Sequence, residues 1–354
     1  MNTFAQQLRQ RGIRQVGLLI GDDTYFRGAA TNPNWDPEDT LRGYGAPVNS
    51  LMLNQNSIGL TLYPQRLNQP LRIQWDDPTD AQDWRLSNQT VTVAANRGES
   101  ADAYRSRTQR LVYVEGQLRV GSASELVAAS INNPGNYLVQ KFRNALTTNG
   151  ITVNQSTVVT STPAPPGEVE LAFIESPPLS VLLKETNQES NNTYAEALLK
   201  TVGKALNPAN LDATIAGAAA VKTILAPLGV NSGQFSMVDG SGLADRNRAS
   251  ATAFVQTLQA MAASPDAQVF RGSLPVAGVS GTLKDRFRNT PAQGRVFAKT
   301  GTISGVVSLS GYISPPNYSP LVFSILTNYS GASTSTVRSA VDEIVLVLTR
   351  LRSC

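Results

Sequence analysis

Two short polar motifs in the second half of the chain could carry chemistry. Lys299-Thr300-Gly301 ends a stretch with the alternating pattern of a strand, and Ser190-Asn191-Asn192 precedes a stretch with helical periodicity. A lysine on an edge strand can supply a fixed cation, a threonine adds a hydroxyl, and a glycine leaves room for a substrate backbone. Each motif also has a structural interpretation. Lys-Thr-Gly can end a strand in a turn, Ser and Asn are preferred helix caps, and Thr193-Tyr-Ala-Glu196 fits a capping box.

The composition excludes several kinds of catalysis. The 354 residues include no histidine, so a histidine general base and a histidine zinc site are both excluded. The single cysteine, Cys354, can form neither an intrachain disulfide nor a cysteine metal cluster. Any reaction must therefore use Ser, Thr, Lys, Tyr, Asp or Glu. We expect no metal site and no cofactor.

The charge distribution and the hydrophobic pattern indicate neither nucleic acid nor membrane. Thirty basic and 26 acidic side chains give a net charge of +4, and the arginine clusters in 9–14 and 105–110 do not alternate with aromatic residues. We therefore expect a solvated surface and no nucleic-acid partner. No run approaches the roughly 18 apolar residues of a membrane helix, and the first residues lack the pattern of a signal peptide.

The first half of the chain is predicted to be rich in strands. A short helix with Phe4 and Leu8 on one face precedes a buried strand at 13–20. Alternating runs predict further strands at 57–63, 89–94 and 110–115, and a helix at 136–149 interrupts them. A Pro-rich joint at 161–167 then predicts two domains, residues 1–165 and residues 166–354.

The second half is predicted to combine helices with an antiparallel sheet. Helical periodicity covers 179–186, 193–206, 211–228 and 250–263, and a last helix covers 335–351. Three strands at 295–302, 306–313 and 321–329 are joined by short turns, which favours antiparallel pairing. The fold class is therefore predicted to be α+β, with an antiparallel sheet flanked by helices.

The two polar motifs match two of the three signatures of penicillin-binding proteins and serine β-lactamases, Ser-x-x-Lys, Ser-x-Asn and Lys-Thr-Gly. The similarity extends over nearly the whole chain and resembles the low-molecular-mass class C penicillin-binding proteins, the D-alanyl-D-alanine carboxypeptidases/endopeptidases of the DacB type. Its segments are 21–26, 33–35, 44–47, 176–180, 185–187, 190–199, 239–243, 246–248, 273–278, 281–283 and 297–302.

This resemblance implies the fold, the location and the substrate. It implies a penicillin-binding/β-lactamase-like transpeptidase domain, with residues 166–354 as its C-terminal part and residues 1–165 as a strand-rich remnant of the family's inserted domains. It implies a place in the periplasm or cell envelope and a peptidoglycan stem peptide ending in D-Ala-D-Ala as substrate. Intact relatives also take β-lactams. Whether carboxypeptidase or endopeptidase action dominates stays open.

The resemblance also implies roles for individual residues. Ser190 would relay a proton to the leaving amine, and Asn192 would bond the amide on the acyl side. Lys299, with Thr300 and Thr302, would hold the terminal carboxylate, and Gly301 belongs to the same substrate-binding strand. Asp239 and Ser241 are expected only to shape the cleft, and Arg248 is expected on the surface.

One departure from the family concerns the nucleophile. No serine in the sequence is followed three residues later by lysine. Ser180 with Lys184 and Ser280 with Lys284 are spaced i,i+4, and we expect both pairs to be ordinary packing or surface residues. The expectation is that the catalytic domain is N-terminally incomplete, that the chain begins after the Ser-x-x-Lys helix, and that it contains no nucleophile and is inactive. A non-catalytic peptidoglycan-binding or scaffolding protein is the alternative, and a β-lactamase fits less well because of the inserted region.

Overall fold

The computed structural model describes residues 1–165 and 169–352, and the chain divides into two compact units. Unit 1 comprises Met1–Glu175 and Asn210–Ala213, and unit 2 comprises Ser176–Ala209 and Thr214–Cys354. The predicted Pro-rich joint includes Pro166 and Gly167, which lie outside the described residues. The assignment of residues 1–165 to the family's inserted domains stays a prediction.

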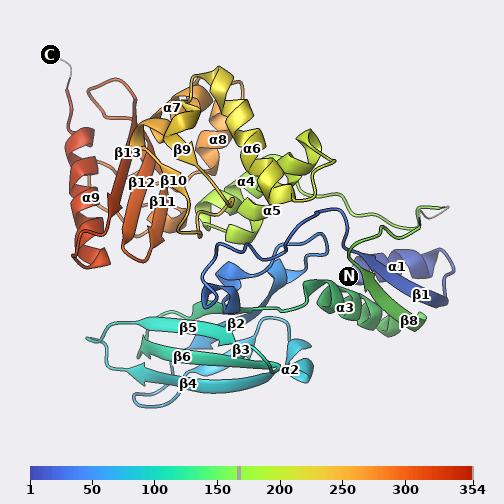
Figure 1. The fold of residues 1–354 in the computed structure, drawn as a ribbon. Helices are drawn as coiled ribbons and strands as arrows, with labels where there is room; N and C mark the ends of the chain where they lie inside the picture. Colours follow the sequence, from blue (N-terminus) through green and yellow to red (C-terminus); the bar gives the residue numbers. More distant parts are fainter. Residues whose placement is uncertain (166–168, 353–354) are drawn as a thin grey trace. The chain divides into compact units, whose positions relative to one another are not determined.

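Unit 1 contains a parallel strand pair and two three-stranded sheets (Figure 1). Its helices and strands are α1 (Asn2–Gln10), β1 (Gln15–Asp22), η1 (Asp39–Leu41), η2 (Gly43–Gly45), η3 (Asn54–Asn56), β2 (Ser57–Tyr63), β3 (Arg72–Trp75), α2 (Asp80–Asp83), β4 (Arg85–Val93), β5 (Ser100–Arg105), β6 (Leu111–Arg119), β7 (Glu125–Ser130), α3 (Pro134–Thr148) and β8 (Thr152–Val159).

The parallel pair joins segments that are far apart in the sequence. Strand β1 pairs with β8 in the register Gln15↔Thr152 to Asp22↔Val159. Helices α1 and α3 pack against these strands through a small core that includes Ala5 and Leu146. Helix α3 ends before Gly150, whose φ of +74° is the left-handed conformation that favours glycine at a helix end.

The two other sheets of unit 1 share one core. Their strand orders are β3-β2-β7 and β4-β6-β5. Strand alternation directs Ile58, Leu60 and Leu62 from β2 into this core, where they join Val112 and Val114 from β6. The alternating patterns at 57–63 and 110–115 therefore correspond to real core-facing strands.

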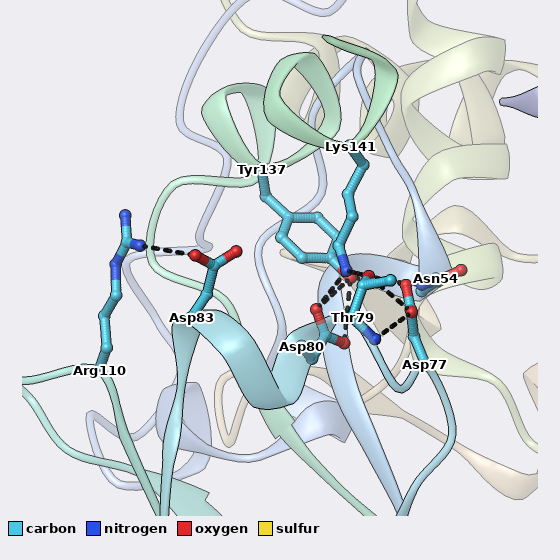
Figure 2. A network of polar contacts seen from close by, with 8 residues as sticks. All are labelled: Asn54, Asp77, Thr79, Asp80, Asp83, Arg110, Tyr137 and Lys141. Atoms are coloured by element: carbon cyan, nitrogen blue, oxygen red, sulfur yellow. Dashed lines mark hydrogen bonds and ion pairs between the residues drawn. The ribbon is translucent and has the colours of Figure 1, made fainter. Parts of the chain in front are cut away.

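A buried polar network connects α3 to α2 and the loop before it (Figure 2). The Lys141 ammonium lies 2.9 Å from Asp77 and 2.7 Å from Asp80, and it also donates to the Thr79 hydroxyl. Tyr137 donates to Asp80 at 3.1 Å. Only 9% of Lys141 and 1% of Asp80 are exposed. Burial raises the pKa of Asp80, so its carboxylate depends on the lysine beside it.

Unit 2 contains the antiparallel sheet predicted from the sequence. Its helices and strands are α4 (Leu179–Gln188), α5 (Asn192–Leu206), α6 (Ala213–Leu225), η4 (Ala226–Leu228), η5 (Ser232–Gln234), β9 (Phe235–Ser236), β10 (Arg248–Ala249), α7 (Ala251–Ala262), α8 (Ala267–Ser273), η6 (Gly281–Leu283), β11 (Val296–Ile303), β12 (Val306–Ile313), β13 (Leu321–Asn328) and α9 (Thr334–Thr349).

The sheet of unit 2 has the order β11-β12-β13 and is covered by helices on both faces (Figure 1). Val307 and Leu309 of β12 share a buried cluster with Val341 and Val345 of α9. Tyr312 projects to the opposite face, where its hydroxyl donates to the Leu258 carbonyl of α7 at 2.8 Å. The predicted α+β class is therefore confirmed.

Candidate active site

A cleft of about 870 Å³ opens within unit 2. Ser190, Asn192 and Lys299 all line it, although 109 residues separate the first from the last. Its other walls include the turn 239–242 and the apolar side chains Phe235, Met237, Phe254 and Leu326. The structure therefore brings the two polar motifs to one concave surface, which is the usual form of a small-ligand site.

Ser190 occupies the corner between α4 and α5. The Asn191 N–H donates to the Thr186 carbonyl at 3.0 Å, which is the long hydrogen bond of a Schellman motif, and Ser190 lies at the position that is usually glycine. Its φ is +57°, in the left-handed region, and this conformation costs a serine roughly 1–2 kcal/mol. Ser190 therefore lowers the stability of the fold relative to a glycine at this position.

Lys299 extends from the edge strand β11 to the Ser190 hydroxyl. The Lys299 ammonium donates to Ser190 Oγ at 2.6 Å and to the Thr300 carbonyl at 2.9 Å. No carboxylate of the described residues forms an ion pair with it. Burial lowers the pKa of Lys299 to about 8, because a desolvated ammonium is less stable than a hydrated one. The cleft therefore holds a cation that an anionic ligand could neutralise.

Asn192 is the first residue of α5, and the N-cap is Asn191. Asn191 Oδ1 accepts the Tyr194 N–H at 3.2 Å. The capping box predicted between Thr193 and Glu196 is therefore wrong. Glu196 instead accepts hydrogen bonds from the turn 239–242, because that turn offers it three donors.

The remaining residues of the Lys-Thr-Gly strand are placed differently. Strand alternation directs the Thr300 and Thr302 side chains away from the face that carries Lys299, and the Thr300 hydroxyl bonds the Thr282 hydroxyl at 2.8 Å. Gly301 lies opposite Ser308, whose Oγ would be only 2.4 Å from an added Cβ. None of Thr300, Gly301 and Thr302 is among the described residues that line the cleft, so their role in substrate binding stays a prediction.

Several cleft residues were not expected from the sequence. Arg248 lies on the two-residue strand β10 and lines the cleft, as does Tyr329, just beyond β13. Single apolar residues carry no sequence signal for a cleft wall, so the apolar side could not be predicted. Ser180, Lys184 and Lys284 are exposed, as expected for surface residues.

Comparison with known proteins identifies the family. The model of the D-Ala-D-Ala carboxypeptidase 3 (S13) family matches residues 1–348. The chain belongs to this family. It is 33% identical over 356 residues to a D-alanyl-D-alanine carboxypeptidase of Actinomadura sp. (strain R39), with 96% of this chain and 65% of that relative covered. The chain spans about two thirds of the length of the curated relatives that it matches.

The fold of this S13 family member has counterparts among solved structures. Penicillin binding protein 4 (dacB) from Haemophilus influenzae superposes with a TM-score of 0.78 at 21% identity, over 99% of this chain and 79% of that one. The same protein complexed with a β-lactam superposes with a TM-score of 0.69 at 21% identity, over 99% and 78% of the two chains. The predicted penicillin-binding fold is therefore confirmed.

Two further features concern membranes and metal ions. No described helix combines the length and apolar character needed to cross a membrane. Across residues 1–165 and 169–352, His, Cys, Asp and Glu side chains form no group of three or more that is arranged to hold a metal ion.

Proposed function

We propose that this protein is a serine-type D-Ala-D-Ala carboxypeptidase or endopeptidase that acts on peptidoglycan stem peptides in the cell envelope. Family membership supports the reaction class, and the contact of 2.6 Å between Lys299 Nζ and Ser190 Oγ supports the location of the site. A peptide ending in D-Ala-D-Ala carries a terminal carboxylate, which complements a cleft that holds a lysine ammonium.

The proposed roles combine the contact between Lys299 and Ser190 with the roles that the family resemblance implies. The Lys299 ammonium attracts the terminal carboxylate, and its hydrogen bond fixes the orientation of the Ser190 hydroxyl. Ser190 relays a proton to the leaving amine, and Asn192 bonds the amide on the acyl side. The assignment of Thr300 and Thr302 to the terminal carboxylate rests on the family resemblance alone, because their side chains point away from the face that carries Lys299. Acyl transfer of this kind also requires a nucleophilic serine with a basic partner, which the family supplies through Ser-x-x-Lys.

Because the sequence contains no Ser-x-x-Lys, we propose that this chain binds the peptide without forming an acyl-enzyme. Incubation with a fluorescent penicillin should give no covalent adduct on a denaturing gel, whereas a D-Ala-D-Ala tripeptide should bind measurably by calorimetry. Lys299→Ala should weaken this binding about 10- to 100-fold, as expected for the loss of a charged hydrogen-bond partner. A penicillin adduct would show that another serine serves as nucleophile, and absent peptide binding would refute the assignment of the cleft.

A non-catalytic peptidoglycan-binding protein is the second candidate. The missing signature favours it, because the cleft keeps a polar site while the sequence provides no recognised nucleophile. Both candidates predict that this chain binds the peptide without releasing D-Ala, measured by a D-amino acid oxidase assay. Release of D-Ala would exclude the non-catalytic candidate and would show that a serine outside Ser-x-x-Lys is the nucleophile.

A further inference from the structure

Glu196 is a buried acidic residue that has no direct place in the proposed reaction. It lies on α5, with only 2% of the residue exposed. Its Oε1 accepts the Gly240 N–H at 2.8 Å, the Ser241 N–H at 2.8 Å and the Ser241 hydroxyl at 2.7 Å. One carboxylate oxygen therefore binds two successive residues of the turn 239–242.

A second buried carboxylate holds the same turn from within. Asp239 is 2% exposed, and it accepts the Gly242 N–H at 2.8 Å and the Ala244 N–H at 2.7 Å. Burial and the charge of Asp239 together raise the pKa of Glu196. Two neighbouring buried carboxylates are unfavourable because both lose hydration and repel each other. The backbone N–H groups of this turn offset that loss by donating hydrogen bonds to both carboxylates.

The turn also lies directly on the backbone of α5. A Cβ added to Gly240 would lie 2.6 Å from the Ala195 carbonyl oxygen and 3.0 Å from the Leu199 side chain. Only a glycine allows this approach. The three hydrogen bonds to Glu196 and the contact at Gly240 together fix the separation between α5 and the turn.

Both of these elements form walls of the cleft. All four turn residues, 239–242, line it, and so does Asn192 at the start of α5. Asn192 and Glu196 are spaced i,i+4 and therefore share one face of the helix. A shift of the turn relative to α5 would change the width of the cleft beside Asn192.

The geometry points to Glu196 as a positioning residue for the substrate cleft. Glu196 holds the turn 239–242 at a fixed distance from Asn192. This inference rests on the proposed function, because it concerns the same cleft. Glu196 does not touch the peptide. It acts through the turn and through the helix that carries Asn192.

The test compares Glu196→Ala, Glu196→Gln and a control variant, Val345→Ala. Val345 of α9 is fully buried against the sheet and does not line the cleft, so Val345→Ala should destabilise unit 2 and leave the hydrogen bonds between Glu196 and the turn 239–242 intact. Affinity for a D-Ala-D-Ala tripeptide is measured at a temperature where circular dichroism shows every variant to be folded. Amide hydrogen exchange at Gly240 and Ser241 and the side-chain amide resonance of Asn192 are recorded without ligand.

Glu196→Ala should weaken peptide binding at least tenfold, speed exchange at both turn amides and shift the Asn192 resonance. Glu196→Gln keeps an acceptor oxygen, so its affinity should stay within about threefold of wild type and its turn amides should stay protected. Val345→Ala should lower the melting temperature and leave all three cleft measurements unchanged.

Two outcomes would overturn the inference: equal loss of affinity in Glu196→Ala and Val345→Ala, or an unchanged Asn192 resonance in Glu196→Ala. If the wild-type chain binds no peptide, the proposed function fails. The exchange and resonance measurements then decide the role of Glu196 by themselves.

Discussion

Replacing Lys299 with methionine should change how the stability of the protein depends on pH. Burial lowers the pKa of Lys299 to about 8 from an ordinary value of 10.5. Between these two values the unfolded chain keeps a proton that the folded chain has released, so the free energy of unfolding of the wild type rises with pH. One pH unit corresponds to about 1.4 kcal/mol, so the buried charge costs the folded state roughly 3 kcal/mol near pH 7 and almost nothing above about pH 10.5.

The assay is urea unfolding of wild type, Lys299→Met and Lys184→Met at several pH values from about 7 to about 10.5. Lys299→Met lacks the titrating group, so its stability relative to wild type should be greatest near pH 7 and should fall by roughly 3 kcal/mol over this range. Lys184 is exposed on α4, so Lys184→Met should follow the wild-type curve. Parallel curves for wild type and Lys299→Met would refute the assignment of a desolvated ammonium to this cleft.

Three further predictions concern the same unit and the buried network of unit 1. The affinity for a D-Ala-D-Ala peptide should be constant below about pH 8 and fall above it as Lys299 loses its proton, and calorimetry with an unchanged affinity at high pH would contradict this. Ser190→Gly should be about 1 kcal/mol more stable than Ser190→Ala in urea, because only glycine relieves the left-handed backbone, and equal stabilities would contradict this. Lys141→Met should lower the free energy of unfolding by about 3–5 kcal/mol, because it leaves the Asp80 carboxylate buried without its cation. Adding Asp80→Asn to this variant should restore much of the lost stability. A Lys141→Met variant as stable as wild type in urea would show that the ion pair contributes little to stability.

Local patterns predicted the regular elements well where hydrophobic periodicity was strong. The strands β2 (Ser57–Tyr63) and β12 (Val306–Ile313) have the predicted bounds, because alternation along a half-buried strand is a property of the local sequence. The pairing of β1 with β8 could not be predicted, since it joins segments more than a hundred residues apart. The short helix α8 (Ala267–Ser273) lacked a clear periodic pattern and was missed.

The candidate site was predictable only in part. The tripeptides directed attention to Ser190, Asn192 and Lys299, which the structure brings to one cleft. The pattern Thr-x-x-Glu favoured a local capping box, but the donors of a turn 44 residues away bind Glu196 instead. A contact between residues so far apart in the sequence cannot be inferred from the spacing of residues within one helix. The left-handed backbone of Ser190 was equally hidden, because the corresponding position in a helix terminus is usually glycine.

Asn191 takes part in both helix ends. Its backbone N–H bonds the Thr186 carbonyl at the end of α4, and its side-chain oxygen accepts the Tyr194 N–H at the start of α5. The three residues between the helices, 189–191, all belong to the two helix ends, so none of them can absorb an insertion or a deletion. The crossing angle of the helices is therefore governed by a few torsions at one corner rather than by loop length. Variation among relatives at this corner should consequently occur by exchange of side chains at constant length, and a one-residue insertion would swing Ser190 out of reach of its lysine.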